Sequence, residues 1–235
     1  MTVYLIPTFI SDNINTLSFE AKEIAKNLDE FIVENEKSAR QFLKLIQTNI
    51  RQNDLKLHLL NEHSTPAEIS TLKSLLNNTS DIGILSEAGC PAVADPGADF
   101  VKMAHEKKIK VVPLSGPSSI LLALMASGLS GQSFVFHGYL PRDSTQRKSK
   151  LLILEKDAQK KKQTQIFMEA PYRNQALLND ILQTCSSATM LCIACDLTSK
   201  EEFIQTKAVG EWKKKVPDTN KKPVIFLIGK ILERK

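Results

Sequence analysis

The sequence has no long apolar run, and this absence argues against a membrane-spanning protein. Its longest apolar stretch, "ILLALMA" at residues 120–126, is far shorter than the ~20 residues that a helix needs to cross a bilayer. The opening residues, "MTVYLIPTFISDN", lack the positive leader and the small-residue cleavage site of a secretory signal. We therefore expect a cytoplasmic protein without a membrane-bound part.

Low-complexity segments and internal repeats are also missing from the 235 residues. Hydrophobic residues make up 42% and charged residues 24% of the chain, a balance typical of a protein that buries a core. A chain of this length forms one large domain or two modest ones.

Common signatures of nucleotide-binding and hydrolytic enzymes are absent. No G-x-G-x-x-G follows the first apolar segment, "VYLIP", and no G-x-x-x-x-G-K-[ST] occurs anywhere, so neither a Rossmann nor a P-loop enzyme is supported. The four histidines form no H-E-x-x-H pair, and no G-x-S-x-G elbow occurs. Zinc-protease and serine-hydrolase chemistry therefore have no support.

Cysteines are few, and their spacing does not favour a metal. Cys192 and Cys195 stand three apart in "MLCIACDL", a segment apolar enough to be a strand. Side chains three apart on a strand point to opposite faces. We favour buried structural thiols over a zinc or redox site, and we expect no metal.

Short apolar strands alternate with amphipathic helices along the whole chain, which indicates an α/β fold. A change in composition predicts two domains, residues 1–114 and 115–235, with a boundary near Leu114. We expect strands at 3–7, 31–33, 55–60, 81–85, 109–114, 164–171, 189–197 and 223–229, and helices at 16–28, 38–50, 65–78, 97–108, 120–127, 142–162 and 173–184.

Two of the helix starts are marked by capping residues. Thr65 is expected as N-cap, with Pro66 at the first helical position and Glu68 three residues beyond the cap. Asp95 is expected to cap the following helix, with Pro96 at its first position.

Two strands lead into loops of small residues, "SEAGCPAVADPG" at 86–97 and "SGPSS" at 115–119. Ligands of open α/β sheets bind beyond the carboxyl ends of strands. Gly89 and Gly116 would let a ligand approach the main chain, and the serines offer hydroxyls. Tight turns are the alternative for either loop alone. The residues thus predict a small-molecule site without identifying the molecule.

The formal net charge of +5 is concentrated in residues 142–162 and 211–222. Basic clusters of this kind form phosphate-facing patches in some proteins and solvated helix faces in others. Both interpretations stay open.

Four stretches resemble the tetrapyrrole methylase superfamily, most closely its ribosomal RNA small subunit methyltransferase I branch. They are "SEAGCPAVADPG", "VVPLSGPSSILLALMASGL", "FVFHGYLPRDSTQRKSKL" and "IFMEAPYR", within a resemblance over roughly residues 3–229. Enzymes of that branch use S-adenosylmethionine to methylate a cytidine ribose 2′-hydroxyl. The resemblance implies two α/β domains with the cofactor in the cleft between them, a homodimer, and ribosomal RNA or the small ribosomal subunit as partner.

The resemblance also implies site residues. Cofactor contacts would come from Pro7, Gly89, Cys90, Pro91, Val93, Ser118, Ser119, Ile120 and Met168. Four carboxylates are candidates for taking the hydroxyl proton, with capping or ion pairing as the alternative for each: Glu34, Glu87, Asp95 and Glu169. Phosphate contacts would come from Arg40, Arg142, Arg147, Lys148 and Arg173.

Several segments depart from the branch's pattern. "PTFISDN" stands where the branch reads P-x-G-N-L, and "VENEK" replaces A-E-D-T-R, which keeps Glu34 and puts Lys37 at the arginine position. "NEH" replaces H-E-H, and "EAGCP" replaces D-A-G-T-P. Most of these changes would face the substrate. A methylase of a small molecule such as a tetrapyrrole, and a non-catalytic RNA- or ribosome-binding protein, therefore stay open as alternatives.

Overall fold

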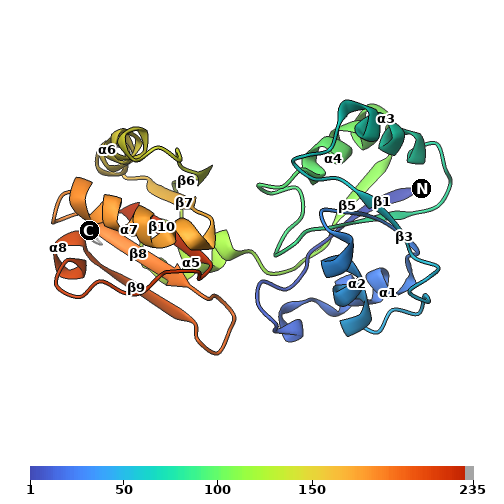
Figure 1. Cartoon of the computed structure of the whole chain (residues 1–235), viewed down its shortest axis with the longest axis horizontal. Coiled ribbons are helices and arrows are strands. Elements are labelled where there is room, and N and C mark those ends of the chain that lie inside the picture. The colour runs from blue at the N-terminus through green and yellow to red at the C-terminus, as the bar shows by residue number, and fades with distance from the viewer. Residues whose placement is uncertain (231–235) are drawn as a thin grey trace. The chain divides into compact units, whose positions relative to one another are not determined.

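The computed structural model describes residues 1–230, and the chain divides into two compact units, Met1–Ser118 (unit 1) and the part from Ser119 onward (unit 2). Each unit contains one five-stranded sheet with helices packed on it (Figure 1). The predicted α/β fold class is confirmed. No helix within residues 1–230 is long and apolar enough to cross a membrane.

The sheet of unit 1 is entirely parallel, with strand order β3-β2-β4-β1-β5. All-parallel sheets are covered by helices on both faces, so their central strands are apolar along their whole length. The central strands β2 and β4 are accordingly buried at every residue. The strands are β1 Thr2–Ile6, β2 Glu30–Val33, β3 Lys56–Leu59, β4 Ile82–Leu85 and β5 Lys110–Pro113.

The helices of unit 1 lie on both faces of this sheet (Figure 1). Helices α1 (Phe19–Asn27) and α2 (Glu36–Leu45) cover one face, where their apolar residues pack on Phe31. Helices α3 (Pro66–Leu75) and α4 (Gly97–Glu106) cover the other face. Full burial of one Phe or Leu side chain contributes about 1.5–3 kcal/mol, so the two clusters fix the sheet and the loops at its edge. A short 3-10 turn, η1 (Ile14–Thr16), precedes α1.

The two predicted helix starts have different outcomes. Thr65 and Glu68 form the expected capping box, and Pro66 begins α3. For α4 the prediction was wrong by one residue, because Pro96 stands at the cap position and Gly97 begins the helix. The Asp95 carboxylate still accepts a hydrogen bond from Gly97 N, at 2.7 Å.

Unit 2 contains a mixed sheet with strand order β6-β7-β10-β8-β9. Strands β6 and β7 are parallel, and the other neighbours are antiparallel. Helices α6, α7 and α8 pack on one face around a shared core, while α5 contacts β8, β9 and β10. The elements are α5 Ser119–Ser127, β6 Phe134–Tyr139, α6 Ser144–Lys161, β7 Thr164–Met168, η2 Pro171–Arg173, α7 Asn174–Thr184, β8 Met190–Cys195, β9 Phe203–Ala208, α8 Val209–Trp212 and β10 Val224–Gly229.

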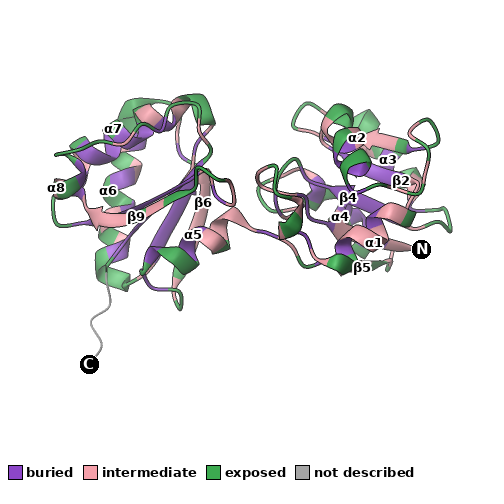
Figure 2. Cartoon of the chain, turned by 90° about the horizontal axis from the view of Figure 1, so that it is seen from below, coloured by how far each residue is buried: buried purple, intermediate pink, exposed green. Residues whose placement is uncertain are grey.

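Strands β6 and β9 and helix α8 were not among the expected elements. β9 lies at the sheet edge, and none of its residues is buried (Figure 2). Its neighbour β8 is central and carries Cys192 and Cys195, which are buried as predicted because helices cover both faces. Burial raises the pKa of Cys195 to about 12. Among residues 1–230, no group of three or more His, Cys, Asp or Glu side chains is arranged to hold a metal ion.

Candidate functional site

The candidate site in unit 1 lies at the carboxyl edge of the parallel sheet. Because its strands run in one direction, their carboxyl ends meet at one edge. Strands β4, β1 and β5 are neighbours, so the segments that follow them start side by side. These are Pro7 and Thr8 after β1, the loop from Ser86 after β4, and the loop from Leu114 after β5.

A backbone bridge joins the first two of these segments. Thr8 N donates to Gly89 O at 2.9 Å, and Gly89 N donates to Thr8 O at 3.3 Å. Ser86 Oγ donates to the same Gly89 carbonyl at 2.6 Å. Gly89 has a φ of +80°, in the left-handed region where a side chain costs roughly 1–2 kcal/mol. Glycine is therefore the residue that this bridge requires.

The loop after β5 packs against the other two segments. A Cβ added to Gly116 would lie 2.2 Å from Pro7 Cγ, so only a glycine allows this approach. Cys90 Sγ lies 3.5 Å from the carbonyl oxygen of Pro117, to which it donates. Contacts between main chain and small side chains thus hold the three segments together.

Asp95 holds the loop after β4 in a strained conformation. Ala92 and Ala94 have φ values of 63° and 59°, which are costly for residues with a side chain. Asp95 Oδ1 accepts hydrogen bonds from Ala92 N at 2.8 Å and Gly97 N at 2.7 Å. Its Oδ2 is buried and has no hydrogen-bond partner among the described residues. Burial raises the Asp95 pKa, and the two backbone bonds oppose this rise.

Three predicted carboxylates meet at this edge. Glu34, which follows β2, accepts a hydrogen bond from Glu87 N at 3.3 Å. Burial raises the Glu34 pKa, the negative charges of Asp95 and Glu87 raise it further, and the Glu87 bond opposes the rise. Ser38 Oγ donates to the Glu87 carboxylate. Glu34 is thus a partly buried carboxyl group that binds a proton more readily than usual.

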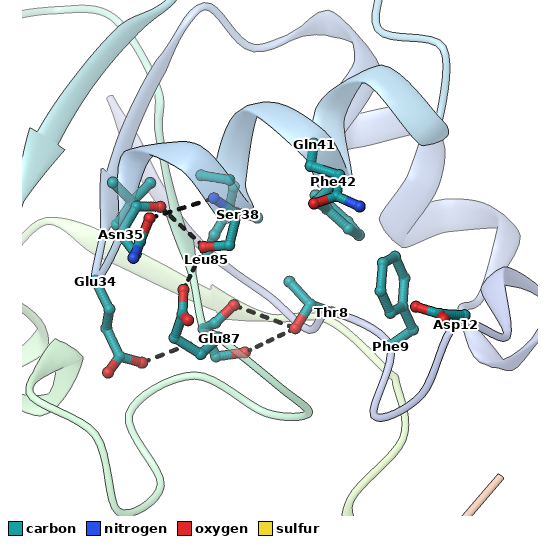
Figure 3. A pocket seen from close by; sticks show the side chains of 13 residues that line it. Thr8, Phe9, Asp12, Glu34, Asn35, Ser38, Gln41, Phe42, Leu85 and Glu87 are labelled. Atoms are coloured by element: carbon teal, nitrogen blue, oxygen red, sulfur yellow. Dashed lines mark hydrogen bonds between the residues drawn. The ribbon is translucent and has the colours of Figure 1, made fainter. Parts of the chain in front are cut away.

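A pocket of about 140 Å³ opens beside these carboxylates. Figure 3 shows Glu34, Asn35 and Glu87 at one end and Phe9 and Asp12 at the other. Sequence reasoning missed most of its lining, since residues such as Phe42 match the pattern of a core-facing helix. The lining residues are Thr8, Phe9, Asp12, Val33, Glu34, Asn35, Ser38, Ala39, Gln41, Phe42, Leu85, Ser86 and Glu87.

The fourth predicted carboxylate, Glu169, lies in unit 2 just after β7. Its buried side chain forms an ion pair with Arg173 at 2.5 Å and accepts a hydrogen bond from Ala170 N at 2.8 Å. The Arg173 guanidinium also lies over the Tyr172 ring, 5.2 Å from its centroid. This arrangement fits the ion-pairing alternative for Glu169.

Arg147 is buried, unlike the other predicted phosphate contacts. Its Nε donates to Asp180 Oδ2 at 2.8 Å, and its Nη1 donates to the carbonyl of Arg142 at 2.8 Å. Arg142 itself is exposed, and Lys148 is partly exposed with its Nζ 2.9 Å from Gln183 Oε1. The geometry around Arg147 is that of an ion pair inside unit 2, and it does not favour contact with a phosphate.

The remaining predicted residues are distributed over both units. Arg40 lies on α2 and donates to the carbonyl of Gln52 at 2.5 Å. Of the predicted cofactor contacts, Pro7, Gly89, Cys90, Pro91, Val93 and Ser118 belong to unit 1, whereas Ser119, Ile120 and Met168 belong to unit 2.

Comparisons with known proteins show what the chain is similar to. Residues 4–212 match the family described as Tetrapyrrole (Corrin/Porphyrin) Methylases. A relative from Streptococcus pyogenes serotype M3 (strain ATCC BAA-595 / MGAS315), named Ribosomal RNA small subunit methyltransferase I, is 33% identical over 97% of this chain and 75% of its own length. Proteins of the same name from Vibrio cholerae serotype O1 and Escherichia coli O157:H7 are 32% and 29% identical, over 89% and 96% of this chain and 69% and 77% of their own lengths.

Proposed function

The chain belongs to the tetrapyrrole methylase family, and from this premise we propose that it uses S-adenosylmethionine to methylate a ribose 2′-hydroxyl in small-subunit ribosomal RNA. The observation that carries the proposal is the similarity, over 97% of the chain, to a relative named Ribosomal RNA small subunit methyltransferase I. A ribosomal RNA substrate implies that the protein acts in the cytoplasm. The homodimer expected from the resemblance is part of the same proposal.

The residues at the carboxyl edge of unit 1 fit S-adenosylmethionine. Gly89 and Gly116 let the segments after β1, β4 and β5 pack closely, because their neighbours would crowd any added Cβ. Ligands of open α/β sheets bind outside this carboxyl edge. When bound, S-adenosylmethionine supplies an activated methyl group. The residues proposed to hold it are Pro7, Gly89, Cys90, Pro91 and Val93, together with Ser118, Ser119, Ile120 and Met168.

Glu34 is the proposed acceptor of the proton that the ribose hydroxyl loses as its oxygen takes up the methyl group. A general base works best when its pKa lies near the working pH, and the Glu34 pKa is shifted upward in that direction. Asp95 and Glu87 support this role through the negative charge that they place near Glu34. Glu169 is a weaker candidate because Arg173 already occupies one of its oxygens.

Basic side chains that are at least partly exposed are proposed to bind RNA phosphates. Arg142 and Lys148 belong to the basic segment around α6, and Arg40 and Arg173 lie partly exposed elsewhere. Arg147 is left out because Asp180 binds its guanidinium inside unit 2. Phosphate contacts of this kind weaken as salt rises, because counterions compete for the backbone.

Methyl transfer to ribosomes tests the function. Small subunits from a strain without this protein are incubated with the purified chain and methyl-labelled S-adenosylmethionine, and label is measured in ribosomal RNA, protein and small molecules. We expect label in the RNA at a ribose 2′-oxygen. Label found only in protein or small molecules would refute the RNA assignment, and a folded chain that does not bind the cofactor in calorimetry would favour a non-catalytic binding protein.

A further inference from the structure

Two exposed tyrosines stand at one edge of the sheet in unit 2. Tyr139 ends β6 and is 58% exposed, and Tyr172 lies in η2, just after β7, and is 67% exposed. Strands β6 and β7 are parallel, and Tyr139 is the register partner of Met168, the last residue of β7. The chain therefore leaves these two strands side by side, with an exposed aromatic ring at each exit.

A buried ion pair holds the ring of Tyr172. The Glu169 side chain is fully buried and pairs with Arg173 Nη2 at 2.5 Å, and the Arg173 guanidinium lies over the Tyr172 ring, 5.2 Å from its centroid. The guanidinium covers one face of the ring, and an exposure of 67% means that the ring still offers surface to a ligand. A ring fixed in this way loses little conformational freedom when it binds.

Basic residues from two distant segments lie at the same edge. Arg142 is exposed in the loop after β6. Lys221 N donates to Pro171 O at 3.0 Å, and the Asn174 side chain donates to Lys222 O at 2.6 Å, so the basic loop before β10 packs beside η2. The two basic segments of the sequence thus meet beside the tyrosines.

The acidic residues of these loops are engaged locally. Asp143 accepts a hydrogen bond from Gln146 N at 2.9 Å as the N-cap of α6, and Asp218 accepts one from Asn220 N at 3.0 Å. The charge of Glu169 is balanced by its ion pair with an arginine. These contacts compensate part of the negative charge, so the edge can attract an anion.

We propose that this edge binds an unpaired segment of RNA, an inference that rests on the proposed function. Unpaired bases stack on aromatic rings in RNA-binding proteins, whereas the bases of a duplex are covered by their neighbours. The tyrosine rings stack on bases, and the cations bind the phosphates that join them. We call this surface the tyrosine edge, and it consists of Tyr139, Arg142, Tyr172, Arg173, Lys221 and Lys222.

Binding of an RNA strand tests the tyrosine edge without methyl transfer. A labelled strand of about 16 nucleotides without self-complementary segments, and its duplex, are titrated with the full chain, and fluorescence anisotropy gives each Kd. Tyr172→Ala and Tyr139→Ala should each weaken binding of the single strand by about 5- to 150-fold, which corresponds to about 1–3 kcal/mol for one stacked base. Tyr172→Phe keeps the ring and should keep the affinity. Binding of the duplex should not change in these variants.

Two further variants serve as controls. Phe19→Ala removes a ring that is 77% exposed but lies on α1 of unit 1, and it should bind the strand as the wild type does. Lys221→Gln removes a phosphate contact instead of a ring. It should weaken binding of strand and duplex alike and lower the slope of the salt dependence by about one.

The outcomes separate this inference from the proposed function. Wild-type affinity of Tyr172→Ala or Tyr139→Ala for the single strand, or equal losses for strand and duplex, would overturn the tyrosine edge even if ribosomal RNA is methylated. Strand binding that depends on both rings, in a chain that does not methylate RNA, would uphold the edge and refute the proposed function. Both rings are exposed, so the variants should keep the native circular dichroism spectrum.

Discussion

Replacing Gly116 with alanine should separate two loops of unit 1 that now touch. The new Cβ would lie 2.2 Å from Pro7 Cγ and 2.4 Å from Pro7 Cβ, whereas real Cβ contacts are essentially never shorter than 3.0 Å. Pro7 is buried and its ring cannot rotate away. The backbone must therefore move, and overpacking of this kind costs about 1–3 kcal/mol.

Urea unfolding of Gly116→Ala measures this cost, with the transition of unit 1 followed through NMR resonances of β1. Gly131→Ala is the control, because no heavy atom lies within 4 Å of its added Cβ. The control should unfold with the wild-type free energy or a slightly higher one, since alanine restricts the unfolded chain. The Gly116 variant should lose about 1–3 kcal/mol.

Cofactor binding gives a second measurement on the same variant. If the loops form part of the cofactor site, their displacement should weaken S-adenosylmethionine binding in calorimetry by at least about tenfold, or about 1.4 kcal/mol. A Gly116→Ala protein as stable as the Gly131→Ala control would refute the close contact with Pro7. A destabilised variant with normal cofactor affinity would refute the role of this loop in binding.

Three further substitutions address the loop after β4 and the neighbouring carboxylates. Gly89→Val should abolish cofactor binding in calorimetry while the circular dichroism spectrum stays native. At this position φ is +80°, and Pro117 O would lie 3.3 Å from the new Cβ. Normal binding would contradict the proposed site. Glu34→Gln should slow methyl transfer by about 10²–10⁴-fold. It should also remove the acid limb of the pH–rate profile, because in the wild type this limb reports a Glu34 pKa above the ordinary 4.5. A retained limb would exclude Glu34 as proton acceptor. Because burial raises the Asp95 pKa in the folded chain, the unfolded chain loses this proton at a lower pH. The free energy of unfolding therefore falls as pH rises from 3.8 toward the pKa of Asp95 in the folded chain. Asp95→Asn keeps an acceptor oxygen and should flatten this fall in urea unfolding between pH 4 and pH 7, and an unchanged slope would show that Asp95 is not its source.

Elements defined by local signals could be predicted from the sequence. The capping box of α3 depends on Thr65 and Glu68, which are three residues apart, and the central strands are apolar because helices cover both faces. Strand β9 escaped prediction because it lies at an edge and carries few apolar residues. Its antiparallel pairing with β8 stabilises it as a strand, although its own sequence carries little strand signal.

The candidate site could be predicted only in part. The small-residue loops indicated where a ligand meets the main chain, but the pocket joins Phe9 from one loop, Phe42 from α2 and Glu87 from another loop. These residues are far apart in the sequence, and no periodic spacing indicates that the fold brings them together. Arg147 illustrates the opposite error, since it belongs to a basic segment, yet its partner Asp180 lies 33 residues away on α7.

The shared hydrogen bonds of Asp95 have a consequence for the motion of the loop after β4. One oxygen accepts from Ala92 on one side and from Gly97, the first residue of α4, on the other. Neither bond can be lost by a rotation of this side chain without disturbing the other. Residues 92–97 should therefore open and close as one cooperative piece, so that loosening the loop also frays the first turn of α4.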